Sequence, residues 1–202
     1  MLFVYYSVSG RNLGDLDFGR AIQSQRLSLV FAHFDAFVGD TFRSIIRQKP
    51  GILRKEKSLK WTEILDFGNW DRLISEMTET LVYDLGWKDI EGKLSFFAEK
   101  FGMEIEIDCD DRALLSAGER LRHLIIHNGG KVSAEHIRRT GDSTQKIGDS
   151  AEIDPKRVDD ITMVLRKAAS DLFKAVSKTF YDKEPSDLTA IPTFGTVEKK
   201  AT

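Results

Sequence analysis

The feature that most constrains the fold is a long apolar repeat near the start of the chain. From residue 18 to about residue 48, apolar residues recur every three or four positions, and several are phenylalanines. This spacing predicts a long α-helix whose apolar side packs in a core or against another helix. The helix should end at Lys49-Pro50-Gly51, because proline disfavours helix at the residue before it. The repeat consists of Ile22, Leu27, Val30, Phe31, Phe34, Phe37, Val38, Phe42, Ile45 and Ile46.

Capping side chains and glycines divide the following part of the chain into short helices. Asparagine and threonine side chains accept hydrogen bonds from the first free N–H groups of a helix, and glycine commonly ends one. Residues 103–107 alternate between apolar and acidic side chains, which predicts a short extended piece. The predicted helices are residues 62–67 capped by Thr62, residues 70–85 capped by Asn69, and residues 89–101 ended by Gly102.

Two further helices, with an irregular stretch between them, are expected in the second half. Asp110 or Asp111 should cap the first of them. Asp154-Pro155 predicts the start of the second, because a capping side chain is followed by proline at the first helical position. The expected order is a helix ending at Asn128-Gly129-Gly130, an irregular stretch over residues 131–153 with one helical turn near Glu135, and a last long helix to about Tyr181.

Composition favours a single all-α domain. Of the 202 residues, 41% are hydrophobic, which is enough for a core, and only four are prolines, which disfavours a loop-rich β-fold. We therefore expect a helical domain over residues 17–181. It should be preceded by a loose N-terminal arm, residues 1–16, and followed by a disordered tail, residues 182–202, where Pro, Thr, Lys and Ser become frequent.

The sequence also indicates where the chain resides and what it binds. A single cysteine, Cys109, excludes an internal disulfide framework and fits a reducing compartment. We expect no signal peptide in the first residues, which lack a basic leader and a small-residue cleavage site, and no stretch approaches the about 20 apolar residues of a membrane span. We therefore expect a cytoplasmic protein with no membrane contact.

Because the net charge is −2, RNA binding would need a local basic patch. One lies at Arg120, Arg122, Lys131, Arg138 and Arg139, opposed by Glu119 and Glu135.

Candidate functional residues gather on the predicted helix that ends at residue 128. Arg122 precedes His127 by five residues, so their side chains diverge by about 140° on an undistorted helix. They meet only if the helix end distorts or if a second copy packs its matching helix alongside, which predicts a site at a homodimer interface. The core side of the helix carries Leu114, Ala117, Leu121, Leu124, Ile125 and Asn128, and the opposite side carries Ser116, Arg120, His123 and His127 with Glu119 beside them.

An arginine and a histidine suit the cutting of RNA without a metal or cofactor. Histidine titrates near neutral pH, so His127 can move the proton of a 2′-hydroxyl or of the leaving oxygen. The guanidinium of Arg122 can bind the phosphate and stabilise the charge that develops on its oxygens. The nucleophile is then the 2′-hydroxyl of the RNA itself, and the products are a 2′,3′-cyclic phosphate and a 5′-hydroxyl.

These residues resemble a known motif. Arg122-x4-His127 followed by Asn128-Gly129-Gly130 is similar to the R-x4–6-H motif of HEPN domains, and the chain resembles bacterial HEPN ribonuclease-like proteins of the RiboL-PSP-HEPN or Abi-like type. The resemblance covers about residues 20–181. It extends to Phe31-Ala32-His33-Phe34-Asp35-Ala36-Phe37, Trp61-Thr62-Glu63-Ile64-Leu65 and Arg139-Thr140-Gly141-Asp142-Ser143.

The resemblance implies a HEPN-type helical bundle that dimerises with both motifs at the interface, and an endoribonuclease that acts as a toxin or in phage defence. Arg122 and His127 take the two motif roles, and an antitoxin or defence-system protein is an expected partner. Supporting or RNA-contacting residues would be His123, Asn128, Arg120, Glu119, Lys131, Arg138 and Arg139. Gly129 stands where nucleotide-silenced HEPN toxins have tyrosine, so that form of control is not expected.

Alternatives remain open at this point. Arg120 shares a helix side with His127 and also satisfies the motif spacing, so either arginine can be the one that acts. His123 and His127 have the spacing of a helical metal pair, with Glu119 as a third ligand, but no HExxH motif is present and Cys109 is alone, which favours two solvated or interface histidines and no metal. The chain can also be a HEPN module that binds RNA, a nucleotide or a partner protein and cuts nothing, or a helical interaction protein with incidental histidines.

Overall fold

The computed structural model describes residues 18–55, 60–141 and 144–182. The predicted arm, residues 1–16, lies outside the described residues, as does the predicted tail apart from Asp182. Within the described chain the fold is all-α, as the sequence predicts, with no strand. In chain order the helices are α1 (Phe18–Gln48), the 3₁₀ helix η2 (Pro50–Lys55), α2 (Trp61–Asp66), α3 (Trp70–Gly86), α4 (Ile90–Phe101), α5 (Cys109–Asn128), α6 (Ala134–Thr140) and α7 (Pro155–Tyr181).

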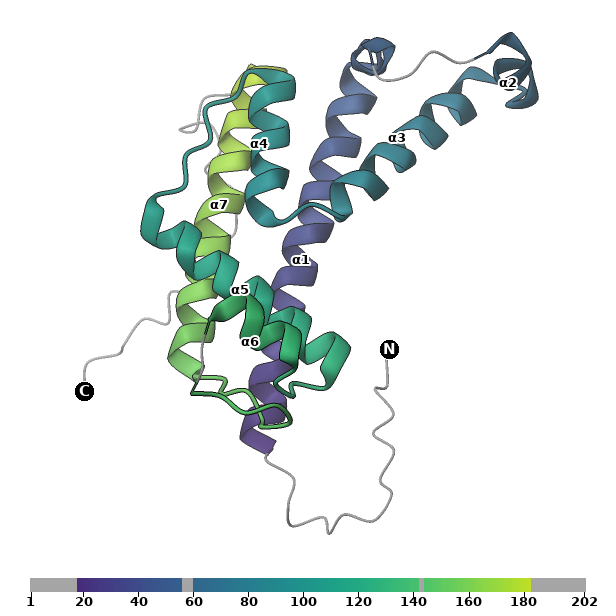
Figure 1. Cartoon of the computed structure of the whole chain (residues 1–202). Coiled ribbons are helices and arrows are strands. Elements are labelled where there is room, and N and C mark those ends of the chain that lie inside the picture. Colours follow the sequence, from purple (N-terminus) through teal and green to yellow (C-terminus); the bar gives the residue numbers. More distant parts are fainter. Residues whose placement is uncertain (1–17, 56–59, 142–143, 183–202) are drawn as a thin grey trace.

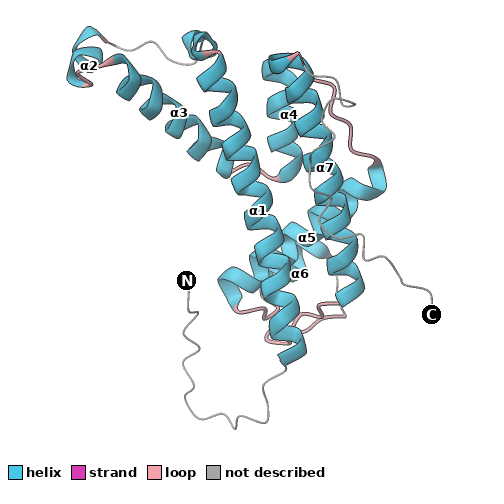
Figure 2. Ribbon diagram, turned by 180° about the vertical axis from the view of Figure 1, so that it is seen from behind, coloured by secondary structure: helices cyan, strands magenta, loops and turns pink. Residues whose placement is uncertain are grey.

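The two longest helices, α1 and α7, pack side by side and form the centre of the bundle. At one end, α3 lies on one side of α1, while α4 and α7 lie on the other, as the two opposite views show (Figures 1 and 2). Helix α5 packs against both α1 and α7, and α6 follows it in the same half of the molecule (Figure 1). No helix in the described ranges is long and apolar enough to cross a membrane.

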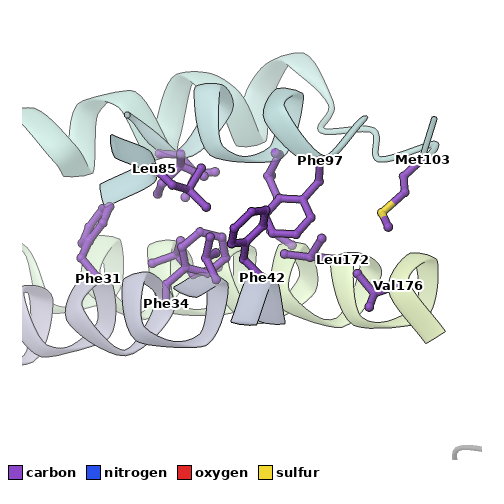
Figure 3. Packing of buried hydrophobic residues seen from close by; sticks show 14 of the residues in the cluster. Phe31, Phe34, Phe42, Leu85, Phe97, Met103, Leu172 and Val176 are labelled. Carbon is purple, nitrogen blue, oxygen red and sulfur yellow. The ribbon is translucent and has the colours of Figure 1, made fainter. Parts of the chain in front are cut away.

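The apolar repeat of α1 supplies much of the core. Phe31, Phe34 and Phe42 are buried, and Figure 3 shows them in one core with Leu85 of α3, Phe97 of α4 and Leu172 of α7. The ring of Phe42 meets that of Phe96 with centroids 5.6 Å apart, and Phe101 meets Phe180 at 5.3 Å. Burying one such side chain stabilises the fold by about 1.5–3 kcal/mol. The phenylalanine repeat therefore lies inside the chain's own bundle.

Several helix ends follow the predicted caps. Asn69 accepts a hydrogen bond from the Arg72 backbone N–H at 2.8 Å at the start of α3. Asp154 caps α7, with Pro155 in the first turn. Gly102 ends α4 in the left-handed conformation, with φ 67°, which favours glycine.

Two local predictions were wrong. The cap of α5 is Asp108, not Asp110 or Asp111: its carboxylate accepts from the Asp111 backbone N–H at 2.9 Å and also pairs with Lys167. The helix α2 begins at Trp61, so Thr62 lies inside it. Residues 103–107, predicted as a short extended piece, lie between α4 and α5 outside any helix and pair with no other described segment, and Met103 packs into the core.

Candidate functional site

The C-terminal end of α5 is fixed by two glycines and by an arginine from the start of α1. Gly129 and Gly130 have φ of 60° and 73°, which favours glycine. Arg20 donates from Nη2 to the Gly130 carbonyl at 2.6 Å and from Nε to the Ala151 carbonyl at 3.2 Å. A Cβ at position 130 would lie 2.6 Å from Arg20 Nη2, so the second glycine also makes room for this contact.

The two histidines of the motif form a pair on the last turns of α5. The ring centroids of His123 and His127 are 4.3 Å apart, and both side chains are exposed. The spacing of four residues stacks them on one side of the helix, as the sequence predicts. Two imidazoles are therefore available to the same bound molecule, one to accept a proton and one to donate a proton.

A hollow of about 290 Å³ lies between α5 and α6, and His123 lines it whereas His127 does not. Ser133 caps α6 by accepting a hydrogen bond from the His136 backbone N–H, which fixes the second wall. Glu135 accepts from Arg139 Nε at 2.6 Å, while Arg120 Nη1 donates to Ser116 at 2.7 Å. The hollow is lined by Arg120, His123, Leu124, Asn128, Ser133, Glu135, His136 and Arg139.

Arg122 lies away from the histidine pair. Its guanidinium carbon is 5.6 Å from the centroid of the Phe31 ring, and Nη2 lies 3.3 Å from Asp35 Oδ2 on α1. Its Nε is buried and has no hydrogen-bond partner. The divergence predicted from the five-residue spacing is thus present in the chain.

Glu119 also turns away from the histidines. Its Oε1 accepts a hydrogen bond from the Ile90 backbone N–H at 2.8 Å, at the start of α4. Burial raises the pKa of the Glu119 carboxyl above its usual value, although the hydrogen bond from Ile90 opposes the shift. Glu119 therefore does not join His123 and His127. Among the described residues, no three acidic, histidine or cysteine side chains lie close enough to hold a metal ion.

The other predicted supporting residues divide between the hollow and the surface. Asn128 was expected on the core side of α5 but is exposed and lines the hollow, because the helix ends there. Lys131 donates from Nζ to the Gly148 carbonyl at 3.2 Å. Arg138 pairs with Glu135, and its side chain is 77% exposed. The structure thus brings Arg120, His123, Asn128 and Arg139 together.

Sequence reasoning missed Asp35, Lys93 and Arg20 as residues that contact this region. Asp35 could have been singled out from the sequence, because an acidic residue beside the apolar side of a long helix suggests a cationic partner. Arg20 and Lys93 carried none, since charged residues are frequent on helices. His136 of α6 also lines the hollow.

Comparison of the chain with protein-family models, with curated proteins and with solved structures found no match. A candidate function therefore depends on the geometry around α5 and on the motif described above.

Proposed function

We propose that this chain is a metal-independent endoribonuclease of the HEPN type that cuts single-stranded or looped RNA. The observation that carries the proposal is that His123 lines the hollow between α5 and α6 while its ring lies 4.3 Å from that of His127. Imidazoles, guanidinium groups and an amide surround a space where a nucleotide can lie. The motif Arg122-x4-His127, which resembles that of HEPN ribonucleases, suggests that the reaction is RNA cleavage.

The reaction needs only proton transfer and charge stabilisation. One imidazole removes the proton of the 2′-hydroxyl, whose oxygen attacks the adjacent phosphorus. The bond from phosphorus to the 5′-oxygen breaks, and the second imidazole donates a proton to that oxygen. His127 and His123 are close enough to share these two roles. Unpaired RNA fits best, because its bases can turn out of the stack and enter a hollow.

Cations for the phosphates are available on the same side of α5. Arg120 and Arg139 line the hollow, and Glu135 opposes part of their charge. Phosphate contacts of this kind supply affinity that is independent of sequence and falls with salt. Arg122 would bind the scissile phosphate, provided that it reaches the histidines of the same or another copy.

A homodimer is part of the proposal. Exposed apolar residues on α1 recur at intervals of four, seven, three and four positions, so they share one side of the helix, as residues do when two helices pack against each other. The Phe-rich repeat gives no support for the dimer, since it is buried in the core. Ile126, beside His127, is also 53% exposed. We define the apolar seam as Phe18, Ile22, Leu29, Ala32 and Ala36.

The HEPN resemblance extends the proposal to a biological role. Many proteins with this motif act as toxins or in defence against phage, so we propose a cytoplasmic effector held in check by an antitoxin or a defence-system partner. The second candidate is a HEPN module that binds RNA, a nucleotide or a partner protein without cutting. The ion pair between Arg122 and Asp35 favours this alternative, because it engages the arginine away from His127.

The deciding experiment incubates end-labelled RNAs with single-stranded and looped regions with the full-length protein and excess chelator. Wild type should generate 2′,3′-cyclic phosphate ends. His127→Ala should cut about 10²- to 10⁴-fold more slowly, because a proton-transfer group is lost, and should still bind the RNA. Glu104→Ala, which removes an exposed titratable side chain before α5, is the control and should cut normally. Intact RNA across pH 6 to 8, with wild type and His127→Ala binding alike, would favour the binding module.

A further inference from the structure

Three charged side chains from three helices meet beside the motif. Asp35 on α1 lies between Lys93 of α4 and Arg122 of α5. Asp35 Oδ1 is 3.1 Å from Lys93 Nζ, and Oδ2 is 3.3 Å from Arg122 Nη2. One carboxylate therefore serves two cations, each through a different oxygen.

The Lys93 side chain is only 5% exposed, so its position requires a counter-ion. A buried ammonium without a partner is strongly unfavourable. Lys93 also donates a hydrogen bond to the Lys88 carbonyl, which fixes its end within the structure. Because Lys93 is held in this way, Asp35 remains paired with Lys93 whether or not Arg122 stays beside it.

Arg122 is held less firmly. Within the described chain, the ion pair with Asp35 is its one contact with an oxygen, and at 3.3 Å it is long for a charge-assisted bond. The buried Nε has an unmet N–H group, which is unfavourable by about 1–3 kcal/mol. The side chain is 30% exposed, so solvent and solutes reach part of it. The observed position of Arg122 therefore leaves most of its donors unused.

We propose that Asp35 is an exchangeable counter-ion of Arg122, which a phosphate group displaces on binding, while Lys93 retains Asp35. The inference rests on the proposed function for the identity of the phosphate, which would be the scissile group of RNA. A phosphate oxyanion accepts two parallel hydrogen bonds from a guanidinium, one of them from Nε. Because Nε is buried in the observed position, the Arg122 side chain moves toward solvent when the phosphate binds; the exchange then satisfies the unmet N–H and leaves no charge unpaired.

The exchange can be measured without RNA. In full-length protein labelled with ¹⁵N, the Nε–Hε signal of Arg122, assigned by its loss in Arg122→Lys, is followed as inorganic phosphate is added. Asp35→Asn removes the competing charge, so phosphate affinity at Arg122 should rise about three- to tenfold. Should Asp35→Asn fold poorly because Lys93 loses its counter-ion, Asp35→Asn with Lys93→Met removes both charges together and should show the same rise. Asp40→Asn, which removes a carboxylate of the same helix that pairs with Arg43, is the matched control and should leave the affinity unchanged.

Two results would overturn the exchange: no phosphate-dependent shift of the Arg122 signal, or an affinity that is unchanged or lower in the double variant. RNA cleavage does not enter the measurement. A phosphate response in a protein that cuts no RNA would therefore refute the ribonuclease proposal and leave the exchange standing.

Discussion

Arg120 and Arg122 are two residues apart on α5 but contact different parts of the molecule. Arg120 lines the hollow beside the histidines, whereas Arg122 lies over Phe31 and pairs with Asp35. The motif spacing accommodates either residue. Because the two arginines contact different groups, substituting each of them can show which one acts in RNA cleavage.

Replacement of each arginine by alanine separates their roles. If Arg122 stabilises the charge on the scissile phosphate, Arg122→Ala should lower the cutting rate about 10²- to 10³-fold and weaken RNA binding. Arg120→Ala should weaken binding severalfold and leave the rate at saturating RNA within about tenfold. Arg112→Ala, which removes an exposed arginine at the other end of α5, is the control. The opposite pattern, with cutting lost only in Arg120→Ala, would identify Arg120 as the motif arginine.

The apolar seam on α1 can be tested by adding charge. Leu29 is 56% exposed, and glutamate there would place a charge within a packed interface. Light scattering should give about twice the 22.9 kDa chain mass for wild type and the single mass for Leu29→Glu, with cutting lost in parallel. Met163→Glu, at an exposed residue of α7, is the matched control. A monomeric wild type that cuts RNA at full rate would disprove the interface site.

Gly118 determines how closely α5 approaches its neighbours. A Cβ there would lie 2.9 Å from Ile161 Cδ1 and 3.1 Å from Phe31 Cζ, and both of those side chains are fully buried. Gly118→Ala should therefore lower the free energy of unfolding by about 1–2 kcal/mol, despite the better helix propensity of alanine. Gly86→Ala meets open space at the end of α3 and should be neutral or slightly stabilising. Equal urea midpoints for the two variants would show that the close contact has no energetic effect.

Glu119 should make stability depend on pH. Because burial raises its folded-state pKa above the usual 4.5, its contribution is full below pH 4.5 and is lost as pH rises through the raised value. Glutamine keeps an oxygen for the Ile90 N–H without the charge, so Glu119→Gln should gain stability relative to wild type as pH rises toward 7. Urea midpoints measured from pH 4 to 7 report the difference. Glu104→Gln, at an exposed site, controls for net charge, and the same trend in both variants would exclude burial as the cause.

The helices were predictable because their signals are local. The repeat of α1 and the Asp154-Pro155 start of α7 depend on residues a few positions apart, and both helices formed where expected. Asp108 was missed because three acidic residues compete within four positions, and the contact with Lys167 of α7 is invisible in sequence. Residues 103–107 alternate like a strand, but a strand needs a partner, which no local pattern supplies.

The candidate site was predictable only in part. The stacking of His123 on His127 follows from their spacing of four residues. The separation of Arg122 from His127 also follows from helix geometry. The contacts of Arg122 with Asp35, and of Arg20 with Gly130, join residues that are 87 and 110 positions apart. They depend on how α1 crosses α5, which only the packed structure shows.

The pairing of α1 with α7 has a consequence for biosynthesis. The two helices at the centre of the bundle are the first and last in the described chain, so the core cannot close until α7 has left the ribosome. Until then, the side of α5 that packs against Ile161 of α7 is exposed to solvent, although the histidines of α5 have already been translated. A chain stopped before residue 155 would lack the support that fixes them. Any activity of α5 is thereby delayed until synthesis has passed the end of α7.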